Sequence, residues 1–193
     1  FSSRRRHTRW NCSSRGLGDV YKRQVFVGAG SNVRPETHLR RALVALAERF
    51  GVLRLSSVYE NSPVGFDGED FLNLVIGFDT DEDVAAVTAC FADIETENGR
   101  TRGEAKFGPR TLDLDLLLYG DLVDEDVLGI PRDEILEYAF VLKPLSELVP
   151  DRRHPIDGRT YAELWAAFDK TGVDLRHYPL ELTGGTDPTT DGE

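Results

Sequence analysis

The stretch Phe107-Gly-Pro-Arg-Thr-Leu-Asp-Leu-Asp-Leu-Leu-Leu-Tyr-Gly120 begins with a Gly-Pro turn and continues as an apolar run that predicts a buried strand. Two carboxylates, Asp113 and Asp115, stand two residues apart within this run. Because strand side chains alternate between faces, both carboxylates point to the same side, about 6.5–7 Å apart along the strand. The opposite face is apolar and can pack against a core through Leu112, Leu114 and Leu116.

Two ionised carboxylates on a buried strand repel each other, and burying them without a partner costs free energy. A cation removes that cost, and paired carboxylates beside substrate phosphates are a typical Mg²⁺ arrangement. The alternative is a solvated strand face, the usual fate of an Asp-x-Asp pair. Nearby guanidinium groups favour the metal interpretation, because carboxylates for a metal and arginines for phosphate oxygens together predict phosphoryl transfer. These arginines are Arg100, Arg102 and Arg110.

The composition limits the classes of protein that fit. With 193 residues, 40% hydrophobic and 30% charged, the chain predicts one domain with an adequate core and no membrane span. Its net charge of −11 argues against a nucleic-acid partner, which would require a basic face. Cys12 and Cys90 are its two cysteines, so we expect a free core thiol and a reducing, cytoplasmic location. We also expect a monomer.

The first residues differ in character from the rest of the chain. Residues 1–24 carry seven Lys or Arg and one acid, have no apolar period and do not form a secretory signal. The chain has no Met, so we expect that its true start is missing, and this leader resembles translated sequencing-adapter sequence. A basic targeting arm is the alternative. We therefore expect a non-native or disordered leader over 1–24, one domain over 25–180 and a disordered tail over 181–193.

The remaining segments predict an α+β protein. Strands are expected over 25–31, 52–59, 71–78 and the Asp113 run, with helices over 35–50 and 84–98. A helical turn in 130–144 and a helix opened by a capping box at Thr160 follow. The order strand, helix, strand, strand, helix, strand predicts a ferredoxin-like antiparallel sheet with helices packed on one face. The other face, carrying Asn73, Asp113 and Asp115, is left for a site.

Several short motifs stand in an order and spacing that resemble one family. The Gly-Pro-Arg-Thr-Leu-Asp-Leu-Asp block is highly specific, whereas Gly-Ser-Asn alone is weak. Over about residues 25–167 the chain resembles hydroxymethyldihydropterin pyrophosphokinases. The motifs are Gly30-Ser-Asn32, Ser62-Pro-Val-Gly65, Asp70-Phe-Leu-Asn73, Ile94-Glu95, Gly99-Arg-Thr-Arg102, Gly108-Pro-Arg-Thr-Leu-Asp-Leu-Asp115 and Phe140-Val-Leu142.

The resemblance implies an enzyme of folate biosynthesis that transfers diphosphate from ATP to the hydroxymethyl group of 6-hydroxymethyl-7,8-dihydropterin and releases AMP. It implies that Asp113 and Asp115 hold two Mg²⁺ ions bridging the ATP phosphates. Arg100 and Arg110 correspond to catalytic arginines. The nucleotide-binding residues implied are Glu95, Arg102, Arg110 and Arg132. Those implied for the pterin are Asn61, Pro63, Val64, Phe71, Asn73, Phe107 and Phe140. Core packing is the alternative role for Phe71 and Phe140.

The chain also departs from the family pattern. Arg132 and Tyr138 stand where the family usually has His and Arg, and Gly103 replaces a frequent basic residue. These changes predict weaker or altered ATP binding. Three alternatives therefore remain: a degenerate paralogue that binds pterin or nucleotide without turnover, a ferredoxin-like interaction module with an acidic surface, and another metal-dependent phosphotransferase.

Overall fold

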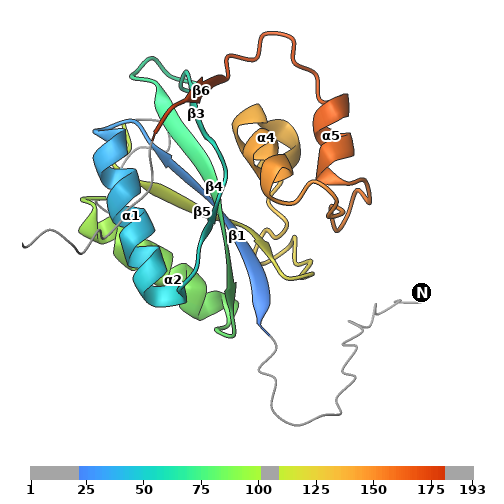
Figure 1. The fold of residues 1–193 in the computed structure, drawn as a ribbon, viewed down its shortest axis with the longest axis horizontal. Coiled ribbons are helices and arrows are strands. Elements are labelled where there is room, and N and C mark those ends of the chain that lie inside the picture. Colours follow the sequence, from blue (N-terminus) through green and yellow to red (C-terminus); the bar gives the residue numbers. More distant parts are fainter. Residues whose placement is uncertain (1–21, 101–108, 181–193) are drawn as a thin grey trace, which may run out of the picture.

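An antiparallel sheet forms the centre of the computed structural model, which describes residues 22–100 and 109–180 (Figure 1). Its strands follow the order β5-β1-β4-β3-β6, and β2 pairs with β4 as a side branch. The antiparallel α+β architecture is thereby confirmed. The strands are β1 (Arg23–Ser31), β2 (Arg54–Leu55), β3 (Val58–Asn61), β4 (Phe71–Thr80), β5 (Asp113–Tyr119) and β6 (Arg176–Tyr178).

Helices α1 (Pro35–Phe50) and α2 (Val84–Glu97) pack on one face of the sheet, as the sequence predicts (Figure 1). Local signals determine their ends: Pro35 opens α1, and Gly51 closes it with a φ of 81°. The Asp83 side chain caps α2 by accepting a 2.8 Å hydrogen bond from the Ala86 N–H. The alternating apolar positions of the strands, including Leu114 and Leu116 of β5, are buried beneath these helices.

Three further helices lie on the opposite face: α3 (Glu134–Glu137), α4 (Ala139–Leu148) and α5 (Tyr161–Ala167). A second apolar cluster joins them to the sheet residues Phe26, Val75 and Leu117. The capping box at Thr160 is confirmed, whereas the packing of this layer on the second face was not predicted. Because these helices cover only part of the face, the region around Asn73 and Asp113 stays accessible.

Several elements differ from the expectations. The strand expected over 52–59 is split into β2 and β3. The ladder is interrupted at Ser56, whose Oγ accepts the Val75 N–H at 2.9 Å while its own N–H donates to the Val75 carbonyl at 3.0 Å. Strand β6 was not predicted. Strand β1 begins at Arg23, so two residues assigned to the leader pair in the sheet; residues 1–21 and 181–193 lie outside the described residues. Within the described ranges, no helix is long and apolar enough to cross a membrane.

Candidate active site

A cavity of about 210 Å³ opens on the second face of the sheet, between the loop that joins β3 to β4 and the start of α4. Its floor is formed by β1, β4 and β5, and its walls by the loop and the α3–α4 segment. Most of the predicted site residues meet here although they are distant in sequence. Those that line the cavity are Asn61, Val64, Phe71, Asn73, Arg110, Asp113, Asp115, Arg132 and Phe140.

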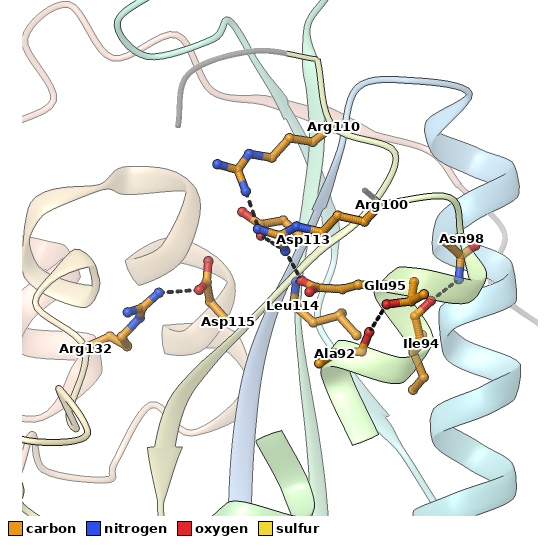
Figure 2. Close-up of polar contacts among 11 residues, drawn as sticks. Ala92, Ile94, Glu95, Asn98, Arg100, Arg110, Asp113, Leu114, Asp115 and Arg132 are labelled. Carbon is orange, nitrogen blue, oxygen red and sulfur yellow. Dashed lines mark hydrogen bonds and ion pairs between the residues drawn. The ribbon is translucent and has the colours of Figure 1, made fainter. Parts of the chain in front are cut away.

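The two carboxylates of β5 lie on the same side of the strand, as predicted, and each is paired with arginine (Figure 2). Asp113 Oδ1 accepts from Arg100 Nη1 at 2.8 Å and from Arg110 Nη1 at 3.0 Å. Asp115 Oδ1 accepts from Arg132 Nη2. Burial, together with the neighbouring Asp113, raises the pKa of Asp115 above its usual range. The two carboxylates therefore meet three guanidinium groups.

Glu95 of α2 connects that helix to the edge of the sheet. Its Oε1 accepts the Leu114 N–H at 2.8 Å and also the Arg100 guanidinium. Burial raises the pKa of Glu95, while the Leu114 N–H and Arg100 oppose the rise. The Arg100 pKa is raised as well: burial lowers it, but Asp113 and Glu95 outweigh that effect. Glu95 thus orients Arg100 towards Asp113, a positioning contact that the sequence did not reveal.

The turn after β1 holds the backbone at Arg110 and Thr111. The Asn32 Oδ1 accepts the Arg110 N–H at 2.7 Å, and the Arg110 carbonyl accepts the N–H groups of Asn32 and Val33 at 3.0 and 3.2 Å. The Ser31 hydroxyl donates to the Thr111 carbonyl at 2.5 Å. Ser31 and Asn32 are both buried, and the Asn32 Nδ2 donates to the Glu69 carbonyl at 3.1 Å. The Gly-Ser-Asn motif therefore fixes the backbone of Arg110 just before β5 begins.

An amide pair forms the polar part of the cavity next to β1. Asn73 Nδ2 donates to Asn61 Oδ1 at 2.6 Å, which fixes the orientation of both amides. Gly30 lies opposite Asn73 in the β1–β4 ladder. A Cβ at position 30 would come within 2.6 Å of Asn73 Oδ1, so the amide lies over Gly30 only because that residue has no side chain.

Gly30→Ala should therefore displace the Asn73 amide and raise the KM for a substrate that this amide contacts roughly tenfold, the cost of about one hydrogen bond. The melting temperature should change little, because the clash involves the end of a side chain. Gly28→Ala is the matched control: its Cβ would meet Leu117 at an ordinary 3.6 Å. Equal KM values for the two variants would contradict this role of Gly30.

Aromatic side chains form much of the remaining wall. Phe66 lies edge-on to Phe71 with ring centroids 6.3 Å apart, and Tyr138 stacks on Phe140 at 5.0 Å. All four rings line the cavity and offer surfaces to a flat ligand. Phe66 and Tyr138 were not among the predicted binding residues, although an aromatic residue in a glycine-rich loop was a usable signal for Phe66. Pro63 was predicted but does not line the cavity.

A second cavity, of about 230 Å³, lies against the outer edge of β5 and α2. It shares Asp115 and Arg132 with the first cavity, and Glu95 lies on its wall. Its other walls are largely apolar: Val84, Phe91, Ala92, Leu114, Leu116, Leu128 and Ile130. The shared carboxylate and guanidinium therefore lie between two separate compartments.

The described residues fit a hard divalent cation that also binds substrate phosphates. They contain no group of three or more His, Cys, Asp or Glu side chains that could hold a metal by themselves. Asp113 and Asp115 offer carboxylate oxygens on one face, and both remain partly exposed to the cavity. Mg²⁺ commonly takes one or two carboxylates and completes its coordination with phosphates and water. The donor set agrees with that pattern.

Three positions singled out in the sequence, Arg102, Gly103 and Phe107, lie outside the described residues. The departure at Tyr138 has a clear place: its ring stacks on Phe140 in the first cavity and is absent from the lining of the second. Arg132, the other departure, pairs with Asp115 and lies 3.6 Å from Glu134. Glu134 also lines the first cavity and was not predicted.

Comparison with known proteins gives a consistent result. The family model 7,8-dihydro-6-hydroxymethylpterin-pyrophosphokinase matches residues 26–150. The 2-amino-4-hydroxy-6-hydroxymethyldihydropteridine pyrophosphokinase of Pseudomonas aeruginosa is 40% identical over 157 residues, covering 78% of this chain and 95% of that protein. The protein of the same name from Bacillus subtilis is 37% identical over 129 residues, covering 64% and 77%.

The solved structure of wild-type HPPK-DHPS from Plasmodium falciparum is also similar, with a TM-score of 0.60 at 13% identity. It is matched over 76% of this chain and 44% of that one, so the present chain spans less than half of that longer protein. At this identity the likeness supports the fold alone. The family match and the bacterial relatives go further: the chain belongs to the 7,8-dihydro-6-hydroxymethylpterin-pyrophosphokinase family.

Proposed function

We propose that this enzyme transfers the terminal diphosphate of ATP to the hydroxymethyl oxygen of 6-hydroxymethyl-7,8-dihydropterin and releases AMP. One observation carries the proposal beyond the family match: two cavities of different character share Asp115 and Arg132. A transfer between two substrates needs a separate compartment for each, with the charged groups at their boundary.

The first cavity suits the pterin. A pterin is flat, apolar on its ring faces and polar on its edges. Phe71 and Phe140 supply aromatic surfaces, while Asn73, held by Asn61, supplies a fixed amide for a ring edge. Tyr138 belongs to this compartment, so its replacement of a basic residue bears on the pterin side and not on ATP affinity.

The second cavity suits the nucleotide. Its apolar walls fit a purine, and β5 is an edge strand of the sheet at this point. From there the phosphates would extend along Asp115 and Arg132 towards the first cavity. Arg132 and Glu95 lie on this path, in agreement with the predicted nucleotide side of the site.

The chemistry at the boundary follows from the charges. The pterin hydroxyl oxygen attacks the β-phosphorus, the bond from that phosphorus to the α-phosphate oxygen breaks, AMP leaves and the hydroxyl proton is lost. Arg100 and Arg110 place guanidinium donors where negative charge develops on the transferring group. Mg²⁺ held by Asp113 and Asp115 would neutralise phosphate charge and orient the phosphates for in-line attack. Two such ions are part of the proposal.

The test is AMP release from ATP at millimolar Mg²⁺, with and without 6-hydroxymethyl-7,8-dihydropterin. We expect AMP only when the pterin is present, in equal amount with the pterin diphosphate detected by mass spectrometry. Appearance of ADP would contradict the transfer chemistry. Pterin binding by calorimetry without any turnover would instead support the degenerate binding paralogue.

A further inference from the structure

The segment after α5 contacts both ends of the loop that forms one wall of the first cavity. We call residues 62–70, which join β3 to β4, the substrate loop, and residues 174–178, which include β6, the clasp. The clasp lies beyond residues 26–150, the range matched by the family model. Its contacts are therefore features of this chain that the family match does not explain.

Arg176 is the centre of these contacts. Its Nη2 lies 2.5 Å from Asp70 Oδ2, at the last residue of the substrate loop. Its Nη1 lies 3.4 Å from Glu60 Oε2 near the end of β3, and its Nε lies 3.2 Å from Asp174 Oδ1. The Ser62 hydroxyl, at the first residue of the loop, donates to Asp174 Oδ2 at 2.9 Å. Arg176 and Asp174 of the clasp thus contact the two ends of the loop, Arg176 at Asp70 and Asp174 at Ser62.

The clasp is itself seated on the sheet. Strand β6 pairs antiparallel with β3, with Arg176 opposite Glu60 and His177 opposite Tyr59. The Tyr178 hydroxyl donates to Glu36 Oε1 of α1 at 2.8 Å. Arg176 therefore extends from a fixed backbone, and its contacts with the loop are made from a rigid support.

The substrate loop contributes Val64 and Phe66 to the cavity wall, and Phe66 packs edge-on against Phe71 at the start of β4. We propose that the clasp holds the substrate loop in the conformation that receives the pterin, with Arg176 as a positioning residue for that pocket. The proposal rests on the proposed function, because it assumes that the pterin occupies the first cavity.

The electrostatics give Arg176 more influence than an exposed ion pair usually has. Its side chain is 51% exposed, and a single pair at such exposure contributes little. Here, however, one cation separates three carboxylates. Without it, Glu60, Asp70 and Asp174 repel one another, and Asp70 lies outside the strand ladder, whereas Glu60 is paired within it. A loop already ordered before binding lowers the entropic cost of capturing a ligand.

The test compares Arg176→Gln, Arg176→Lys and wild type in the complete chain. Arg54→Gln is the matched control, because Arg54 forms an exposed pair with Asp79 at 3.3 Å on the same sheet, away from the loop. Hydrogen exchange reports the order of amides 62–70 without ligand. Calorimetry measures the affinity for 6-hydroxymethyl-7,8-dihydropterin at saturating α,β-methylene-ATP and Mg²⁺, in 50 mM and 500 mM NaCl.

In Arg176→Gln we expect exchange of amides 62–70 to accelerate about tenfold and pterin affinity to fall about three- to tenfold, with kcat within about twofold. Arg176→Lys should recover part of the affinity, since it restores the charge but not the planar guanidinium that contacts several carboxylates at once. Because the pterin is uncharged, salt should affect its binding only by screening the ion pairs of Arg176. High salt should therefore weaken pterin binding to wild type and Arg54→Gln but not to Arg176→Gln.

Three outcomes would overturn the proposal in distinguishable ways. Equal exchange of amides 62–70 in wild type and Arg176→Gln would show that the clasp does not hold the loop, whatever the enzyme binds. Faster exchange with unchanged pterin affinity would show that the loop is held but that this does not matter for binding. If wild type binds no pterin, the proposed substrate is wrong and the positioning role is lost with it, while the exchange result stands.

Discussion

Asp115→Ala should reduce turnover about a thousandfold or more at millimolar Mg²⁺, the loss expected when a metal-bound charge stabilisation of several kcal/mol is removed. Asp115 lies between the two cavities and on the same side of β5 as Asp113. Its loss leaves Asp113 as the one carboxylate of the pair, and a cation held by two acidic oxygens loses half of that support. The measurement is pterin-dependent AMP release over a range of Mg²⁺ concentrations.

The fold should survive this change. Burial and the neighbouring Asp113 both disfavour ionised Asp115, so removing it relieves repulsion even as Arg132 loses one of its two acidic partners. We expect a melting temperature within about 3 °C of wild type. Asp121→Ala is the control, since Asp121 follows β5 closely and has a 99% exposed side chain. Retention of wild-type activity and Mg²⁺ dependence in Asp115→Ala would falsify the metal assignment.

Patterns that depend on neighbours in the sequence were predicted well. The period of two along β5 separated the aspartates from the leucines, and the structure buries those leucines under α1 and α2. The capping box at Thr160 and the stop at Gly51 are equally local, because each depends on backbone groups within one turn. The order of the motifs then indicated the family, and the site residues that the resemblance implied include residues of both cavities.

Contacts between distant segments could not be predicted in this way. Nothing near Asn32 in the sequence indicates that its amide holds the backbone of Arg110, because the two meet only once β1 and β5 are neighbours. Strand β6 has three residues and depends on pairing with β3, so its sequence carries no periodic signal. The contacts of Arg176 follow from that pairing. The local signal for the Asn32 contact is the run of polar residues at the end of a strand in the Gly-Ser-Asn motif, which is too short to identify its partner.

Arg110→Ala should lower kcat about a hundred- to a thousandfold while pterin affinity changes less than about threefold. The Arg110 guanidinium is directed at Asp113 from a backbone held on both sides by Asn32, so its position is set before substrate arrives. A donor fixed in this way stabilises charge that develops during transfer and contributes little to holding a neutral pterin. Steady-state kinetics for turnover and calorimetry for pterin binding separate the two effects.

Two further variants distinguish charge from geometry at this position. Arg110→Lys keeps the charge but loses the planar fork, so we expect it to recover less than about a tenth of the lost rate. Arg49→Ala is the control, since Arg49 forms a partly exposed pair with Glu82 at the end of α1, outside both cavity linings. A large loss of pterin affinity with kcat preserved would make Arg110 a binding residue. Full recovery of the rate by Arg110→Lys would mean that positive charge near Asp113 is sufficient. The contacts of Asn32 with the backbone would then not serve to orient a planar guanidinium.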